Sequence, residues 1–270
     1  MTKPTRLNVA RRLVATHPVM GTIASLHLIS SNLAQAAFDQ AAAACWAELD
    51  DLERIFSPHD ERSEIRRLAS GELMLGEANP LVSTVAEDCE EARERTRGLF
   101  DPWSKGWFNP TGYVKGWAAE RVAERYLAPL LASLGVDAIG LWLGGDIWLR
   151  TNSDSDWVWQ VAIADPHHPG GIKARLEIKD GAVATSGIAE RGLHIDDPRT
   201  GEPATTVASA SVIADRLVDA DLWATTAVVA GFDNLDWISQ AGTRAGLLVA
   251  NNGRTRRWVG AYELVEAGNQ

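Results

Sequence analysis

The chain has 270 residues, of which 26 are Lys or Arg and 36 are Asp or Glu, so its formal net charge is −10. This acidic balance argues against nonspecific binding to nucleic acid, which depends on Lys and Arg side chains that neutralise phosphates. The length and the 46% hydrophobic content are those of a soluble globular protein with a sizeable core, and no linker-like segment divides the chain. We therefore expect one domain over residues 1–270.

The N-terminal segment contains Arg6, Arg11 and Arg12, but no long apolar run follows them. We therefore expect no secretory signal, no lipoprotein cysteine, no transmembrane segment and a cytoplasmic location. The two cysteines, Cys45 and Cys89, lack the spacing of a metal-binding or redox motif. This pattern predicts two reduced thiols and no disulfide.

The first third of the chain predicts one strand and two helices. Apolar and polar residues alternate over 23–29, which favours a strand preceded by a turn at Gly21. Residues 33–56 are rich in helix formers and carry an apolar stripe, so they predict a core helix. Residues 84–97 predict a second helix, capped by Ser83, with a charged solvent face to which we assign no function.

Residues 109–134 predict a helix that begins in a glycine-containing turn and is bent or broken at Pro129. Gly112 and Gly116 leave the backbone N–H groups of its first turns accessible, and such helix starts attract phosphates. Lys115 is placed to reach a phosphate. It is equally well placed to extend into solvent.

Residues 136–150 predict two buried strand segments around Gly144-Gly145-Asp146. Two adjacent glycines at this position suit backbone that faces a bulky ligand, although a β-bulge explains them as well. Alternating patterns near 157–163 and 175–179 predict two further strands with one solvated face each.

The stretch 181–201 concentrates polar chemistry after a buried strand. Thr185, Ser186 and Gly187 follow the apolar residues, where the chain can turn and a ligand can approach. Residues 194–200 then supply one imidazole, two carboxylates and a guanidinium, and 197–201 have the residue types of a turn. A surface hairpin with solvated charges would have the same composition.

Residues 219–231 predict a helix on which Asp221 and Thr225 share one face. A carboxylate and a hydroxyl together suit Mg²⁺, which takes few protein ligands and keeps phosphate and water oxygens for the rest. The same pair is also explained by an acidic residue near the helix N-terminus and a Thr bonded to its own backbone.

Seven elements in chain order resemble motifs of the ApbE family of FAD:protein FMN transferases. They are Met20-Gly21-Thr22; Ser63-Glu64-Ile65; Phe100-Asp101-Pro102; Gly112-Tyr113-Val114-Lys115-Gly116-Trp117-Ala118; Leu143-Gly144-Gly145-Asp146-Ile147; Val183-Ala184-Thr185-Ser186-Gly187 with His194-Ile195 and Asp197-Pro198-Arg199-Thr200-Gly201; and Ala220-Asp221 with Ala224-Thr225. Any one of them is weak evidence, but their order is specific.

The resemblance implies an α+β fold related to the T-fold, with a largely antiparallel sheet and helices packed on it, which the strand and helix patterns also favour. It implies an enzyme that uses Mg²⁺ to transfer FMN from FAD to a Thr of an acceptor flavoprotein, with release of AMP. By resemblance, Asp221, Thr225 and the backbone carbonyl of Val114 hold the metal, and His194 transfers the proton. The residues implied to contact FAD are Met20, Gly21, Thr22, Ser63, Glu64, Gly112, Lys115, Gly144, Gly145, Asp146, Thr185, Ser186, Gly187, His194, Ile195, Asp197, Arg199, Thr200 and Gly201.

The chain departs from the family pattern in three places. Residues 109–112 lack the usual acidic group, Val114 replaces an Ala, and the segment after Pro102 reads Trp-Ser-Lys-Gly instead of an apolar run. Two other functions fit the same residues. One is a Mg²⁺-dependent FAD pyrophosphatase that gives FMN and AMP, and the other is a non-catalytic FAD-binding protein.

Overall fold

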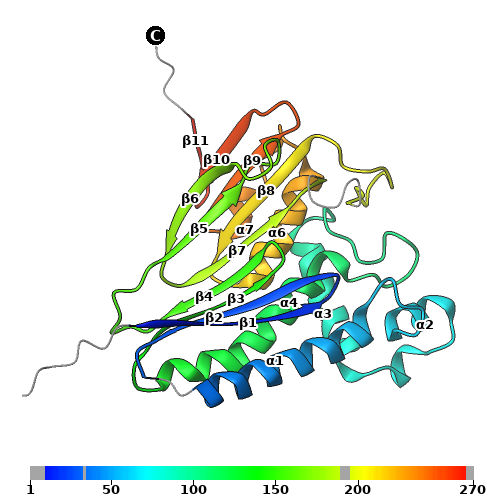
Figure 1. Ribbon diagram of the computed structural model, residues 1–270. Helices are drawn as coiled ribbons and strands as arrows, with labels where there is room; N and C mark the ends of the chain where they lie inside the picture. Colours follow the sequence, from blue (N-terminus) through cyan, green and yellow to red (C-terminus); the bar gives the residue numbers. More distant parts are fainter. Residues whose placement is uncertain (1–9, 33–34, 189–194, 266–270) are drawn as a thin grey trace, which may run out of the picture.

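A computed structural model describes residues 10–32, 35–188 and 195–265. Its main feature is a sheet in which β1, β2, β3, β4, β7, β8, β9, β10 and β11 are neighbours in that order, and each strand is antiparallel to its neighbours (Figure 1). These strands are β1 Arg11–Val19, β2 Thr22–Ser30, β3 Val136–Leu143, β4 Asp146–Thr151, β7 Gly181–Ser186, β8 Val207–Ala214, β9 Ala245–Ala250, β10 Thr255–Val259 and β11 Tyr262–Leu264. A separate hairpin consists of β5 Trp159–Ala164 and β6 Ile172–Ile178.

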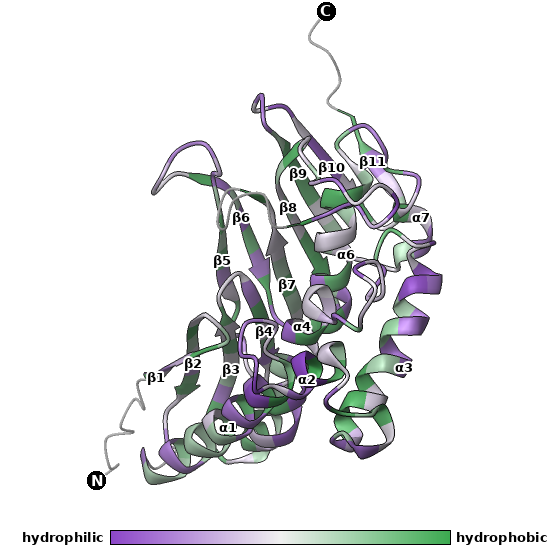
Figure 2. Cartoon of the chain, turned by 90° about the vertical axis from the view of Figure 1, so that its right-hand side faces the viewer, coloured by the Kyte–Doolittle hydropathy of each residue, from purple (hydrophilic) through white to green (hydrophobic). Residues whose placement is uncertain are grey.

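The helices lie on one side of the main sheet (Figure 2). They are α1 Gln35–Phe56, α2 Glu64–Ser70, α3 Pro80–Arg95, α4 Thr111–Val122, α6 Leu217–Ala230 and α7 Ile238–Ala241, with short 3₁₀ turns at Leu75–Glu77 and Ala128–Ala132 and a π-helical segment at Ala123–Leu127. This arrangement is the α+β class with a largely antiparallel sheet that the sequence predicts.

Two apolar layers hold the elements together. On β2, Ala24, Leu26 and Leu28 point into the layer between sheet and helices, and all three are fully buried. Ile29, next along the strand, joins the second layer, where the sheet packs against inward residues of the β5–β6 hairpin such as Trp159. The predicted alternation along the strands therefore corresponds to two real faces.

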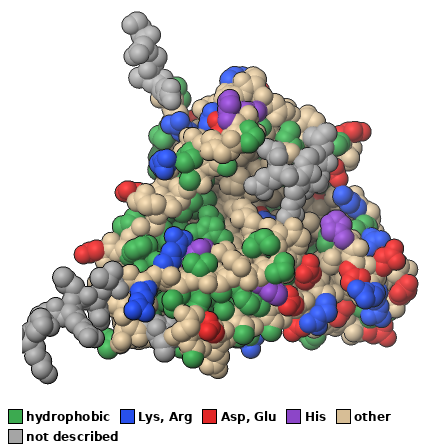
Figure 3. Space-filling model, in the orientation of Figure 1, with side chains coloured by type: hydrophobic (Ala, Val, Ile, Leu, Met, Phe, Trp, Pro, Cys, Tyr) green, Lys and Arg blue, Asp and Glu red, His purple; other side chains and the backbone are tan. Residues whose placement is uncertain are grey.

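The space-filling view shows that charged and hydrophobic side chains gather on different parts of the surface (Figure 3). Acidic and basic side chains intermingle around α2, whereas hydrophobic side chains remain visible over the strands beside the hairpin (Figure 3). Val14 and Ile23, on β1 and β2, are each about half exposed, at 51% and 55%. The β5–β6 hairpin thus covers the helix-free face only in part.

The strand predicted from Ile23 is confirmed as β2, and the turn predicted at Gly21 connects it to a further strand, β1, through Met20 and Gly21, which both have positive φ. Pro18 is accommodated because β1 is an edge strand and needs no ladder donor there. The second helix begins at Pro80, not after Ser83, because Asn79 accepts a hydrogen bond from Leu81 N and Pro80 occupies the first turn.

Pro129 interrupts the helix that follows α4, as predicted. Proline cannot donate to the carbonyl four residues earlier and its ring crowds that carbonyl. The chain widens into the π-helical turn over Ala123–Leu127, where the N–H of Ala128 bonds to the carbonyl of Ala123, and then narrows to a 3₁₀ turn.

Among the described residues, no helix combines the length and apolarity needed to span a bilayer.

Candidate active site

A cavity of about 180 Å³ lies where α4, α6 and the end of β7 meet two loops. Its lining combines cationic, carboxylate and hydroxyl side chains with exposed backbone. The residues that line it are Leu99, Phe100, Asp101, Ser104, Lys105, Asn109, Thr111, Gly112, Lys115, Gly145, Thr185, Ser186, Gly187, Ile195, Asp196, Pro198, Asp221, Thr225 and Val229.

Helices α4 and α6 approach each other closely at Gly116. A Cβ at this position would lie 2.7 Å from Cβ of Asp221 and 3.1 Å from the carbonyl oxygen of Leu217, so only glycine fits. The close approach lets the N–H of Gly116 donate to Oδ2 of Asp221 at 2.9 Å. Asp221 is buried, and its carboxylate is therefore oriented by the backbone of the other helix.

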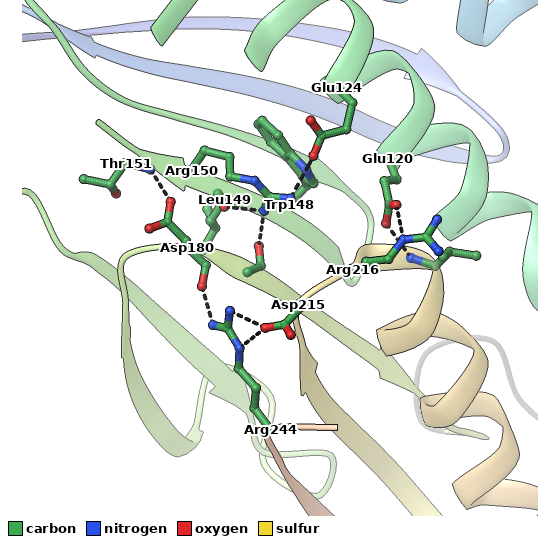
Figure 4. Close-up of polar contacts among 12 residues, drawn as sticks. Glu120, Glu124, Trp148, Leu149, Arg150, Thr151, Asp180, Asp215, Arg216 and Arg244 are labelled. Atoms are coloured by element: carbon green, nitrogen blue, oxygen red, sulfur yellow. Dashed lines mark hydrogen bonds and ion pairs between the residues drawn. The ribbon is translucent and has the colours of Figure 1, made fainter. Parts of the chain in front are cut away.

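A second contact fixes the same pair of helices from outside the cavity. Glu120 of α4 accepts from Nε of Arg216 at 2.8 Å and from the N–H of Val218 at 3.1 Å, at the start of α6 (Figure 4). A carboxylate at a helix N-terminus satisfies orphan donors and complements the helix dipole. One turn later, Glu124 accepts from Trp148 Nε1 at 3.1 Å and so ties the helix to β4.

Lys115 connects three elements. Its Nζ forms an ion pair with Oδ2 of Asp146, the first residue of β4, and lies 3.8 Å from Oδ1 of Asp221. Asp146 is fully buried, whereas the Lys115 side chain is 22% exposed and lines the cavity. Of the two alternatives for Lys115, extension into solvent is thus wrong.

Hydroxyl groups lie beside these charges. Thr225 Oγ1 is 3.0 Å from Ser186 Oγ at the end of β7, and Thr185 Oγ1 is 2.8 Å from Ser211 Oγ on β8. Thr225 lies one turn after Asp221 on α6, and both line the cavity. The predicted shared face of this helix therefore points at the site.

This donor set fits a magnesium ion in its chemistry. Asp221 and Thr225 present a carboxylate and a hydroxyl to one cavity, and Mg²⁺ prefers oxygen ligands of which few come from protein. Val114, the third proposed ligand, is buried on α4 immediately before Lys115 and is not among the described lining residues. No group of three or more His, Cys, Asp or Glu suited to a metal occurs among the described residues.

The lining of the cavity contains an ion pair that was not predicted from the sequence. Lys105 Nζ lies 2.9 Å from Oδ2 of Asp196, and both residues line the cavity. Lys105 lies in the segment after Pro102, where the sequence departs from the family pattern. That departure was the only feature of the sequence that could have drawn attention to Lys105.

The turn at 197–201 is confirmed, with Gly201 at a φ of 76° and its N–H bonded to the carbonyl of Asp197. Within it, Arg199 donates to the Asp197 carboxylate and thereby holds the pKa of Asp197 below its ordinary value. Asp197, Arg199, Thr200 and Gly201 are not among the described lining residues. His194 lies outside the described residues.

Of the other residues predicted to contact FAD, some lie at or beside the cavity and others have partners within the fold. Gly145 lines it, and Gly144 has a φ of 60° with Thr22 Oγ1 3.0 Å from the position of a Cβ, so the β1–β2 and β3–β4 turns are adjacent. Ser63 and Glu64 have local structural partners. Ser63 caps α2 by accepting from Arg66 N, and Glu64 accepts from Asn79 N at 2.6 Å.

Sequence comparisons match this chain to one protein family. A sequence model described as the ApbE family matches residues 20–109 and 104–247. A protein of Treponema pallidum named FAD:protein FMN transferase is 36% identical over 138 residues, which cover 44% of this chain and 37% of that protein. One of Rhodobacter capsulatus with the same name is 37% identical over 171 residues, covering 58% of this chain and 31% of that protein. The chain thus matches only about a third of the length of these relatives.

Two solved structures share the fold. An ApbE protein of Thermotoga maritima superposes with a TM-score of 0.75 at 21% identity, over 92% of this chain and 97% of the other. The apo form of the flavinyl transferase ApbE of Pseudomonas stutzeri gives 0.72 at 19% identity, over 93% and 94%.

Proposed function

The chain belongs to the ApbE family, and from this premise we propose that it is a Mg²⁺-dependent FAD:protein FMN transferase. In the proposed reaction a Thr hydroxyl of an acceptor flavoprotein attacks the phosphorus of the FMN half of FAD. The new Thr–phosphate ester forms as the pyrophosphate bond breaks, AMP leaves, and the Thr proton passes to a base. We further propose that residues 1–270 act as one domain.

One observation carries the proposal. A single cavity brings together the Lys115 ammonium, the Asp221 carboxylate and the Thr225 hydroxyl, which come from two helices that only a glycine contact allows to approach so closely. The two relatives named FAD:protein FMN transferase support the choice of substrate and acceptor class.

The residues of this chain have separate roles in the proposed reaction. Asp221 and Thr225 would hold Mg²⁺, which when bound supplies positive charge to the phosphate oxygens. Lys115 adds a second, permanent positive charge on the same side of the cavity. Gly112, Gly145 and Gly187 line the cavity in which we propose that the dinucleotide binds.

His194 is the proposed base, by family resemblance alone. A neutral imidazole near pH 7 accepts a hydroxyl proton, and general-base catalysis of this kind contributes typically ~10²–10⁴-fold.

The decisive experiment is incubation with FAD, Mg²⁺ and a Thr-containing acceptor domain, followed by intact mass measurement of the acceptor. We expect the mass of one FMN adduct and release of AMP. FMN and AMP without an adduct would identify a pyrophosphatase, and bound FAD without turnover would identify a binding protein. Loss of turnover in His194→Ala with FAD affinity retained would support the proposed base, and unchanged turnover would eliminate it.

A further inference from the structure

The ammonium of Lys115 lies near two carboxylates, those of Asp146 and Asp221, but it is not equally close to both. The ammonium of Lys115 pairs directly with Asp146 but stays 3.8 Å from Oδ1 of Asp221. Asp221 receives its closer hydrogen bond, at 2.9 Å, from the N–H of Gly116.

The burial of Asp146 explains this preference. Burial of an unpaired carboxylate is strongly unfavourable, and the Asp146 side chain has no exposed surface, so Asp146 holds the neighbouring ammonium of Lys115. Lysine is a compact point charge on a flexible stem, and it can move between two neighbouring carboxylates. Among the described residues, the Asp221 carboxylate also lies within 4 Å of the Lys115 ammonium, so it is close enough to accept the ammonium if Asp146 is neutralised.

An ammonium bonded to Asp221 would compete with a divalent cation for the same carboxylate. We propose that Asp146 is a positioning residue that keeps the Lys115 ammonium away from Asp221, so that Asp221 can bind a divalent cation while Lys115 faces the cavity. This inference rests on the proposed function for the identity of the cation.

The resemblance to the ApbE family instead implies that Asp146 contacts FAD. Its neighbour Gly145 lines the cavity, whereas Asp146 is not among the described lining residues and has no exposed surface. Its influence on the site is therefore expected to pass through Lys115.

A double-mutant cycle tests the inference through Mg²⁺ binding alone. The proteins are the wild type, Asp146→Asn, Lys115→Met and the double variant, and the measurement is the Mg²⁺ dissociation constant by calorimetry without FAD. We expect Asp146→Asn to weaken Mg²⁺ binding roughly tenfold or more, as loss of an outer-shell partner typically does. In the Lys115→Met background, the same change should alter the constant by less than about threefold, because the competing ammonium is gone.

The cycle distinguishes the effect of Asp146 on the position of Lys115 from the effect of its negative charge. If Asp146 acted only through its negative charge, Asp146→Asn would weaken Mg²⁺ binding by the same factor in both backgrounds, and the inference would be wrong. If the wild type bound no Mg²⁺, both the Mg²⁺ dependence in the proposed function and this inference would be wrong. Wild-type binding without coupling would overturn the inference and leave the proposed function standing.

Circular dichroism and thermal unfolding would reveal a folding defect in Asp146→Asn. In that case a second variant tests the inference. Asp146→Glu keeps the charge but displaces the carboxylate by one methylene. We expect it to weaken Mg²⁺ binding although the net charge is unchanged. Wild-type affinity in a folded Asp146→Glu protein would contradict the inference.

Discussion

Gly116 is the point at which the fold and the candidate site depend on the same contact, and Gly116→Ala tests both. The added Cβ would lie 2.7 Å from the Cβ of Asp221 and 3.0 Å from its Oδ2, and 3.1 Å from the Leu217 carbonyl oxygen. Ordinary carbon–carbon contacts are about 3.5–4.0 Å. Helices α4 and α6 would therefore have to separate by roughly 1 Å at this point.

The size of the effect follows from two opposing terms. Overpacking of this kind costs typically about 1–3 kcal/mol. Replacing glycine by alanine within a helix contributes about 1 kcal/mol in the opposite direction. We therefore expect Gly116→Ala to lower the free energy of unfolding by about 0–2 kcal/mol, and to weaken Mg²⁺ binding because Asp221 loses its position.

Gly112→Ala is the matched control for stability, since it makes the same substitution in the same helix. Its Cβ would meet a ring carbon of Phe100 at 3.2 Å and a methyl carbon of Thr225 at 3.5 Å, and these side chains can adjust. Guanidinium unfolding and Mg²⁺ calorimetry provide the measurements. A Gly116→Ala protein more stable than Gly112→Ala, with wild-type Mg²⁺ affinity, would refute the argument.

Three further results are expected. Thr225→Val should weaken Mg²⁺ binding roughly tenfold or more in calorimetry, whereas Thr226→Val, which removes a buried hydroxyl with no partner among the described residues, should not; equal effects would argue against Thr225 as a ligand. Burial lowers the pKa of His27 to about 4, so the unfolded chain binds more protons between pH 6.5 and 4 and stability falls as pH falls through that range. Unfolding curves of His27→Gln should lack this part of the pH dependence, and curves parallel to wild type would count against it. Burial raises the pKa of Cys45 to about 12 and that of Cys89 also, so both thiols should react with a disulfide reagent at pH 8 only in guanidinium; labelling of the folded protein would contradict their burial.

The sequence was most informative where a pattern was local. The shared face of Asp221 and Thr225 follows from helix periodicity, and both side chains line the cavity. The strand pair around Gly144 and Gly145 and the break at Pro129 were likewise predictable, because each depends on a single residue type with a strong backbone preference.

Contacts between distant segments were not predictable in this way. Lys115 and Asp146 are 31 positions apart, and nothing in either segment specifies that they pair. Lys105 and Asp196 come from two separate segments that line the same cavity. Residue patterns supply candidates, whereas tertiary packing selects the partners.

Some motif residues that are expected to contact the ligand also have partners within the fold. Glu64 accepts from the N–H of Asn79, which itself caps α3. A hydroxyl or carboxylate at a helix start is a common cap, and the sequence alone does not distinguish a cap from a ligand contact.

The main sheet follows chain order, but one of its neighbouring pairs is separated by a long excursion. Ser30 of β2 pairs with Val136 of β3, and α1 to α4 lie between them in the sequence. Closing such a loop costs more chain entropy than forming the short β3–β4 hairpin. Because non-local pairing slows folding, we expect β3 and β4 to pair early and the β1–β2 hairpin to join the sheet late, after the intervening helices have formed a surface for it.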